Sequence, residues 1–165
     1  LSVHTIFDAP CGDFNWMRAF LSDVKVRYIG ADIVQELIDS HNQLYQNESR
    51  RFLNLNLIAD PFPDADIMIC RDCLFHLSYA DIYQVLTNFT KANIAYLLTT
   101  THKNQNDFLN TDIQSGDFRM IDLFSPPFNF PLNPLCRIDD WVAPDPEREM
   151  CLWNKAQIIS VLKQR

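Results

Sequence analysis

The stretch of sequence that decides the fold is Thr5–Trp16, T-I-F-D-A-P-C-G-D-F-N-W. A short apolar run ends in an acid and then turns sharply, which predicts a strand over Val3–Phe7 and a helix over Phe14–Leu21. Gly12 has no Cβ, so the backbone there can bend tightly and admit a ligand closely. The N–H groups at the start of the helix would favour a carboxylate or phosphate beyond the strand. An ordinary turn at Gly12 is the alternative.

The next predicted strand supports the ligand-binding interpretation. In nucleotide-binding sheets an acid at the end of the second strand, roughly 20 residues further on, receives the ribose hydroxyls. Val26–Asp32, V-R-Y-I-G-A-D, supplies this acid as Asp32 at an exposed strand end. Two strands that each end in an acid and are joined by an amphipathic helix favour a nucleotide site over a chance turn.

The rest of the chain continues to alternate between strand and helix patterns. Three further helices and five further strands are predicted: helices over Val34–Tyr45, Tyr79–Ala92 (with Ser78 as N-cap) and Lys155–Leu162, and strands over Arg51–Leu57, Ala65–Cys70, Ile94–Thr101, Leu135–Val142 and Glu149–Trp153. The last two strands are predicted to form a hairpin that closes the sheet.

Length and composition limit the function classes. At 165 residues we expect one domain, 1–165, with a core that needs no metal or disulfide. The net charge of −7 argues against a nucleic-acid partner, which normally requires clustered cations. No run approaches the roughly 18 apolar residues of a membrane span. The chain begins at Leu1, directly before the first predicted strand, so we expect a missing N-terminal segment.

The five cysteines predict reduced thiols in a cytoplasmic protein, because their number is odd and their spacing irregular. Cys70 and Cys73 form a C-x-x-C pair, which we interpret as packed thiols without metal. A zinc site that also includes Cys11 and His76, or a redox pair, are the alternatives.

Three motifs in order resemble those of class I S-adenosylmethionine-dependent methyltransferases. They are D-A-P-C-G-D-F from Asp8, Y-I-G-A-D-I from Tyr28 and D-I-M-I-C-R-D-C-L-F-H-L from Asp66. Later parts of the chain resemble a subset of small bacterial-type members, namely Thr100-Thr101, Asn104, Gly116 with Arg119, Pro126–Pro131 and Leu152-Trp153. Of the family's acid-x-Gly-x-Gly-x-Gly pattern only Gly12 is kept, with Pro10 and Phe14 at the outer positions. The resemblance implies an α/β, Rossmann-like doubly wound sheet of about seven strands. Most strands would be parallel, with an antiparallel C-terminal hairpin and helices on both faces.

The resemblance also implies S-adenosylmethionine as cofactor and assigns residues to it. Asp8 would reach the methionine amino group, Asp32 the ribose hydroxyls and Asp60 the adenine amino group. An acid that only caps a turn is the alternative for Asp60. The remaining cofactor-binding candidates are backbone and wall positions: Ala9, Pro10, Cys11, Gly12, Ile33, Cys70 and Arg71.

Candidates for catalysis are Asp72, His76 and His102, because all three follow strands that end at the same rim. Histidine has the ordinary pKa best suited to proton transfer near neutral pH, although a structural, hydrogen-bonded His76 is an alternative. Segment 103–131 is expected to be a substrate-side loop insertion. Its candidates are Asn104, Asn106, Arg119 and Phe128, the last within the rigid stretch P-P-F-N-F-P. A loop that only covers the core is the alternative for this segment, and simple solubility is the alternative for the cations Arg71 and Arg119.

The sequence therefore predicts a methyltransferase that acts on a small-molecule acceptor, whose identity and oligomeric state stay open. Two alternatives from other classes are a non-catalytic S-adenosylmethionine-binding scaffold, favoured by the incomplete glycine pattern, and an NAD-linked oxidoreductase. The hairpin ending argues against the oxidoreductase, whose last strands are parallel.

Overall fold

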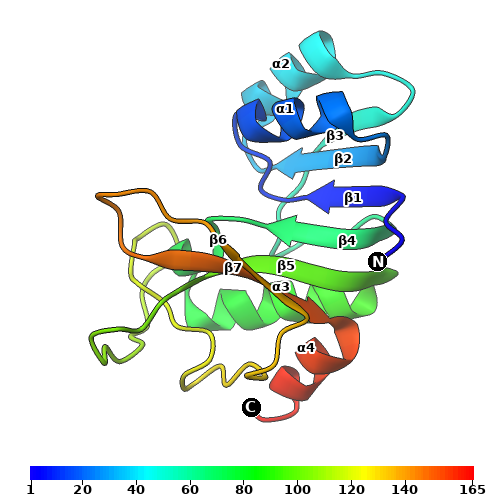
Figure 1. Ribbon diagram of the computed structural model, residues 1–165. Helices are drawn as coiled ribbons and strands as arrows, with labels where there is room; N and C mark the ends of the chain where they lie inside the picture. The colour runs from blue at the N-terminus through cyan, green and yellow to red at the C-terminus, as the bar shows by residue number, and fades with distance from the viewer.

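The computed structural model describes residues 1–165, and a seven-stranded sheet in the order β3-β2-β1-β4-β5-β7-β6 runs through its middle (Figure 1). Neighbouring strands are parallel except β7, which is antiparallel to both β5 and β6. The mostly parallel sheet with an antiparallel ending is thereby confirmed. The strands are β1 (Thr5–Asp8), β2 (Arg27–Asp32), β3 (Arg50–Asn54), β4 (Ala65–Cys70), β5 (Ile94–His102), β6 (Cys136–Asp139) and β7 (Arg148–Asn154).

Helices cover both faces of the sheet, because successive side chains of each strand point to opposite sides. Ile6 of β1 packs in the core beneath α1 and α2, together with Met17 of α1. Phe7, the next residue, packs in the larger core beneath α3 and α4, together with Phe89 of α3. The helices are α1 (Asn15–Asp23), α2 (Gln35–Tyr45), α3 (Tyr79–Lys91) and α4 (Lys155–Leu162), with the short 3₁₀ turn η1 (Leu74–His76) before α3. None of them combines the length and apolar character that a membrane crossing requires.

An aromatic cluster explains why Phe14 can replace the third glycine of the motif. Phe14 precedes α1 with φ 63°, and its ring is fully buried against Tyr28 and Phe52, at centroid distances of 5.2 and 5.0 Å. Gly30 makes room for this cluster, since a Cβ there would lie 2.8 Å from the Phe52 ring. The bulky side chain therefore points into the core beneath α1 and α2.

Two predicted strands are shorter than expected. β3 ends at Asn54 because residues 56–60 turn back on themselves, with the Asn56 amide donating to the Asp60 carboxylate at 2.8 Å. β6 runs only from Cys136 to Asp139, and the side chain of the next residue, Asp140, forms an ion pair with Arg71. The other element boundaries agree with the predicted ones to within two residues.

The segment between β5 and β6 contains no helix or strand, yet it is fastened to the sheet. The His102 amide donates to the Ile121 carbonyl at 2.8 Å, and the Leu123 amide donates to Thr101 Oγ1 at 2.9 Å. Leu123 and Phe130 are buried in the larger core. The segment therefore forms part of the layer that covers the α3 side of the sheet (Figure 1).

Candidate functional site

A cavity of about 250 Å³ lies at the carboxyl ends of β2 and β4, where ligands of open α/β sheets bind. Its walls are mostly apolar, with a few polar side chains, as in many ligand sites. The lining residues are Pro10, Ala31, Asp32, Ile33, Leu55, Asn56, Leu57, Ile58, Asp72, Cys73, His76 and Leu77. The cavity brings together residues from the first two motifs and from the end of the fourth strand, and the predicted Asp8, Cys11, Gly12, Cys70 and Arg71 are not among its lining residues.

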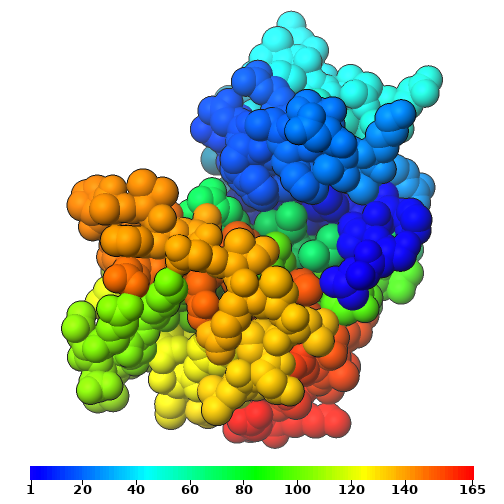
Figure 2. Space-filling model, viewed as in Figure 1, coloured from blue at the N-terminus to red at the C-terminus, as the bar shows by residue number.

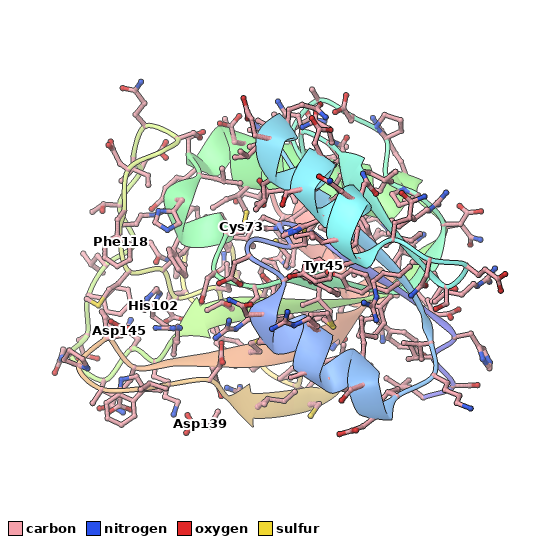
Figure 3. The ribbon with its side chains drawn as sticks, turned by 90° about the horizontal axis from the view of Figure 1, so that it is seen from above. Tyr45, Cys73, His102, Phe118, Asp139 and Asp145 are labelled. Carbon is pink, nitrogen blue, oxygen red and sulfur yellow. The ribbon has the colours of Figure 1, made fainter.

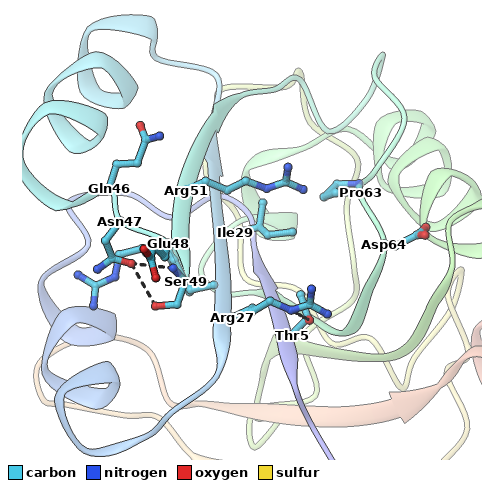
Figure 4. A pocket seen from close by; sticks show the side chains of 12 residues that line it. Thr5, Arg27, Ile29, Gln46, Asn47, Glu48, Ser49, Arg51, Pro63 and Asp64 are labelled. Carbon is cyan, nitrogen blue, oxygen red and sulfur yellow. Dashed lines mark hydrogen bonds between the residues drawn. The ribbon is translucent and has the colours of Figure 1, made fainter.

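A larger hollow of about 770 Å³ lies at the opposite edge of the sheet, near the first residues of β1, β2 and β3 (Figure 4). Its walls are mostly polar, with Arg27 and Arg51 on either side of Ile29 and the loop around Asn47 beside them. Amino ends of strands are not where this type of sheet places its ligands. The smaller cavity is therefore the candidate site.

Asp32 occupies the position expected for ribose recognition, but its carboxylate is buried rather than exposed, with 8% of its surface accessible. One carboxylate oxygen accepts from the Gly12 amide at 3.2 Å, and the other accepts from the Val34 amide at 3.1 Å. Each oxygen keeps a further lone pair. Asp32 thus joins the turn after β1 to the end of β2 and still has acceptors for a ligand.

The turn Ala9–Gly12 is held at both ends. The Ala9 amide donates to the Ile69 carbonyl at 2.9 Å, and the Cys11 amide donates to the Ala31 carbonyl at 2.8 Å. The ring of His41 donates from Nε2 to the Gly12 carbonyl at 2.7 Å, because a carbonyl can only accept. Gly12 has φ 50°, the left-handed conformation that favours glycine. The turn is thus fixed before any ligand binds.

Asp8 at the end of β1 is a buried carboxyl with one unsatisfied oxygen. Oδ2 accepts from the Tyr28 hydroxyl at 2.7 Å, whereas Oδ1 has no hydrogen-bond partner. Burial raises the pKa of Asp8 to about 7, against the opposing effects of the Tyr28 hydrogen bond and of nearby Arg71. A positively charged group placed beside Oδ1 would ionise this carboxyl and satisfy it.

Asp60 lies outside the residues that line the cavity. Its carboxylate accepts from the Asn56 amide, and its own amide donates to the Asn56 carbonyl at 2.9 Å. This is the turn-capping arrangement, and it does not support a contact with adenine. The turn instead presents Leu57 and Ile58 to the cavity. Neither was a predicted site residue, because the third strand was predicted to run through Leu57 and Ile58 has no local signal.

His76 is the candidate base that faces the cavity. Its Nδ1 lies 2.8 Å from the carbonyl oxygen of Asp117. Since that oxygen can only accept, Nδ1 carries the proton and Nε2 of the neutral ring keeps its lone pair. The Phe75 and Phe118 rings pack against the imidazole, at centroid distances of 4.6 and 5.8 Å. The ring is therefore oriented with one nitrogen able to accept a proton.

Asp72 also lines the cavity, but two arginines hold its carboxylate. Arg148 Nε lies 3.2 Å from Oδ1, and Arg71 Nη2 lies 3.8 Å from Oδ2. The residue has φ 50°, an uncommon conformation for a side chain other than glycine, and its amide donates to Thr100 Oγ1 at 2.9 Å. The two arginines therefore fix the direction of this carboxylate where it lines the cavity.

His102 does not line the cavity, contrary to its prediction as a catalytic candidate. The side chain is buried, and its Nδ1 accepts from the Ile121 amide at 3.1 Å. Burial lowers the pKa of His102. Its ring lies 6.3 Å from that of Phe118 and 5.1 Å from that of Phe75, and His102 and Phe118 lie to the left of Cys73 and Tyr45 in Figure 3. His102 anchors the following segment.

Neither Arg71 nor Arg119 is a simple surface cation. Arg71 donates two hydrogen bonds to Asp140, at 2.8 and 3.1 Å, and its guanidinium lies over the Trp16 ring. Arg119 is buried, with Nη1 donating to the Leu74 carbonyl at 3.4 Å, and burial lowers its pKa. Arg71 is therefore already paired, and Arg119 is buried, with its guanidinium over the Tyr79 ring.

The other predicted substrate-side residues lie away from the cavity as well. Asn104 closes a small loop, donating to the Phe108 carbonyl and accepting from the Phe108 amide, both at 2.9 Å. Asn106 is exposed to solvent. Phe128 is fully buried, with its ring 5.1 Å from that of Tyr79. Of segment 103–131, the part that meets the site is the stretch around Asp117, which holds His76.

All five cysteines are free thiols. The hydrogen bond between the Cys70 and Cys73 side chains, together with burial, raises the pKa of Cys70 well above its usual value, which favours the inert thiol form. No group of three or more His, Cys, Asp or Glu side chains is arranged to hold a metal ion.

Several solved structures of methyltransferases have a fold similar to that of this chain. The chain is similar to the S-adenosylmethionine-dependent methyltransferase SibL, with a TM-score of 0.67 and 12% identity over 93% of this chain and 50% of that chain. The fold is that of class I S-adenosylmethionine-dependent methyltransferases. No protein-family model matches the sequence, and no curated protein matches it.

Two further solved structures share this fold. The N-methyltransferase NodS from Bradyrhizobium japonicum WM9 has a TM-score of 0.65 and 10% identity, over 93% of this chain and 86% of that chain. The 1,6-didemethyltoxoflavin-N1-methyltransferase from Burkholderia thailandensis, solved with its substrate and S-adenosylhomocysteine, has a TM-score of 0.67 and 15% identity, over 92% of this chain and 70% of that chain. This chain thus spans only half the length of SibL but most of NodS.

Proposed function

We propose that residues 1–165 form a methyltransferase domain that transfers the methyl group of S-adenosylmethionine to a small-molecule acceptor. One observation carries the proposal: Asp32 and a correctly oriented His76 face the same apolar cavity at the carboxyl edge of the sheet. The names of the enzymes with this fold support it, because NodS is an N-methyltransferase and the Burkholderia enzyme contains S-adenosylhomocysteine.

The cavity suits the adenosine half of the cofactor. Asp32 would accept from the ribose hydroxyls with the lone pairs that its backbone contacts leave free. Leu55, Leu57 and Ile58 would pack against the adenine. The unsatisfied oxygen of Asp8 fits the ammonium group of the methionine half.

The bound cofactor supplies an activated methyl group, whose leaving thioether is neutral. The chain must therefore position the acceptor and exclude water, and it must remove a proton when the acceptor carries one. His76 Nε2 is free to accept that proton, while the Asp117 carbonyl stabilises the Nδ1–H of the ring. The carboxylate of Asp72, which is paired with Arg148 and lines the same cavity as His76, would help to orient the acceptor.

Calorimetric titration with S-adenosylmethionine, and in parallel with NADH, tests the cofactor assignment. We expect one site for S-adenosylmethionine and none for NADH. A screen of small metabolites, followed by release of S-adenosylhomocysteine, then tests turnover. Binding without turnover of any acceptor would favour the non-catalytic scaffold, and binding of NADH alone would overturn the proposal.

A further inference from the structure

The edge of the sheet at β6 is open. β6 is the last strand in the order, and all four of its residues are exposed. The Asp140 amide donates to the Arg148 carbonyl at 3.4 Å, so even-numbered residues of this strand point their backbone groups toward β7. The N–H and C=O groups of Arg137 and Asp139 therefore point outward and can pair with another strand.

Large apolar side chains gather along the same edge. Ile138 is 47% exposed, and residues on both sides of the strand are similarly accessible, namely Leu132, Leu135, Trp141 and Val142. A hollow of about 590 Å³ lies beside the strand, lined by Trp16 and Phe20 of α1 as well as by Ile138. Figure 2 shows the segment around β6 in orange, facing the blue α1 across this hollow. Contiguous exposed apolar surface of this kind marks interaction sites.

We propose that a second copy of this chain pairs with β6 in antiparallel orientation, about a two-fold axis through Ile138. The sequence R-I-D, Arg137–Asp139, is complementary in charge to its own reverse around this residue. In this register Arg137 lies opposite Asp139 of the second copy, and Ile138 lies opposite its own equivalent. The outward N–H and C=O groups of Arg137 then lie opposite those of Asp139 in the second copy, and the reverse holds for Asp139. Each of these two residue pairs can therefore form two backbone hydrogen bonds.

The neighbouring symmetric registers are unfavourable. A two-fold axis perpendicular to the sheet leaves each side chain on its own face of the sheet. Side chains on the same face stay opposite each other only if the axis passes through a residue, so the alternative registers centre the axis on another residue of β6. Centring the axis on Arg137 would oppose two arginines, and centring it on Asp139 would oppose two aspartates, both of which are destabilising. The charge pattern thus selects Ile138 as the centre and a copy of the same strand as the partner.

The flanking residues fit the same axis. Leu135 lies three residues before Ile138 and Trp141 three residues after it, so both flank the axis, and the Leu135 amide, which donates to the Leu152 carbonyl at 2.7 Å, stays bonded to β7. Both are exposed in the single chain, at 51% and 39%. The pairing would join two seven-stranded sheets edge to edge. It would also place the second copy next to Asp140, which holds Arg71 at the rim of the candidate site.

Sedimentation velocity over a concentration series tests the pairing. We expect the mass to rise from 19.3 kDa toward twice that value. Asp139→Arg places two cations opposite each other and should abolish the increase, whereas Arg137→Asp combined with Asp139→Arg should restore it. Lys103→Ala is the matched control, because it removes the ion-pair partner of Asp139 within the chain and leaves the strand intact.

Cross-linking tests the register. In a Cys136→Ser background, Ile138→Cys places two thiols in a pair without backbone hydrogen bonds, with Cα atoms about 4.5 Å apart, within reach of a disulfide. Mild oxidation should give a covalent dimer. The native Cys136 should not cross-link, because it would face Asp140 of the second copy. A monomer at every concentration, or a dimer that Ile138→Cys fails to cross-link, would overturn the proposal.

Discussion

Asp32 has two tasks at the end of β2, since it ties down the Gly12 amide and has acceptors left for a ligand. We expect Asp32→Ala to weaken S-adenosylmethionine binding tenfold or more, because each lost charge-assisted hydrogen bond contributes about 1.5–3 kcal/mol. The affinity of Asp32→Asn for S-adenosylmethionine should lie between those of the unmodified chain and Asp32→Ala, because Asn keeps an acceptor and loses the charge. Calorimetric titration measures the affinities.

Glu36→Ala provides the control for this change, because Glu36 is an exposed acid on α2 outside the cavity. Its affinity should equal that of the unmodified chain. Circular dichroism of the Asp32 variants should show an unchanged fold. An unaltered affinity in Asp32→Ala would remove this residue from the site.

Asp8 makes the stability of the ligand-free protein depend on pH. Its pKa is about 7 in the folded chain, against an ordinary value of 3.8 for aspartate, so the folded state binds the proton more tightly. The free energy of unfolding should therefore fall as pH rises from about 4 to about 7, by up to about 1.4 kcal/mol per pH unit from this group.

Asp8→Asn cannot ionise, so we expect this contribution to the slope to vanish in that variant. Urea unfolding at pH 5 and pH 7.5 measures the difference for both proteins. The two proteins should differ most in stability at the higher pH, where the unmodified chain holds a buried charge. Identical slopes would show that Asp8 does not retain its proton in the folded state.

His76 can be tested by separating its two ring nitrogens. Asn in this position keeps a donor near Nδ1 for the Asp117 carbonyl but has no base. We expect His76→Asn to keep the melting temperature and cofactor affinity while turnover of a protic acceptor falls 10²- to 10⁴-fold. His76→Ala should lose stability as well. If the Asn variant turns over such an acceptor at the full rate, His76 is structural only.

At the scale of elements, the segment between β5 and β6 acts as a core layer. Phe128 is fully buried against Tyr79 and Tyr83, so Phe128→Ala should lower the free energy of unfolding by about 3–5 kcal/mol. Leu109→Ala, in the same segment but 86% exposed, should change it by less than about 0.5 kcal/mol. Chemical denaturation compares the two, and S-adenosylmethionine affinity of the folded fraction should be unchanged in both.

At the scale of the whole molecule, cofactor binding should stabilise the fold. A ligand that binds only the folded state at 100 times its Kd adds about 2.7 kcal/mol. For a chain of this length we expect the melting temperature to rise by several degrees with S-adenosylmethionine and not with NADH. Scanning fluorimetry measures both, with Asp32→Ala as the control that should respond less. A rise with NADH alone would favour the oxidoreductase alternative.

Local sequence patterns determined the sheet and the half of the site that lies at strand ends. Continuous apolar character marked β4, and the acids Asp8 and Asp32 are the last residues of their strands. Such positions can be predicted because the carboxyl ends of parallel strands meet at one edge, whatever the distant chain does. The antiparallel ending of the sheet could be predicted for a similar reason, since two short strands joined by a loop form a hairpin.

Only the tertiary structure decided where the side chains beyond the strands point. His102 and Phe128 were predicted to face a ligand, but both side chains are buried. Leu57 and Ile58, which were not predicted as site residues, line the cavity. In segments that lack the apolar periodicity of a helix or strand, contacts with residues distant in sequence set the direction of a side chain. The Asp117 carbonyl that orients His76 lies 41 residues away along the chain, a relation that no local pattern encodes.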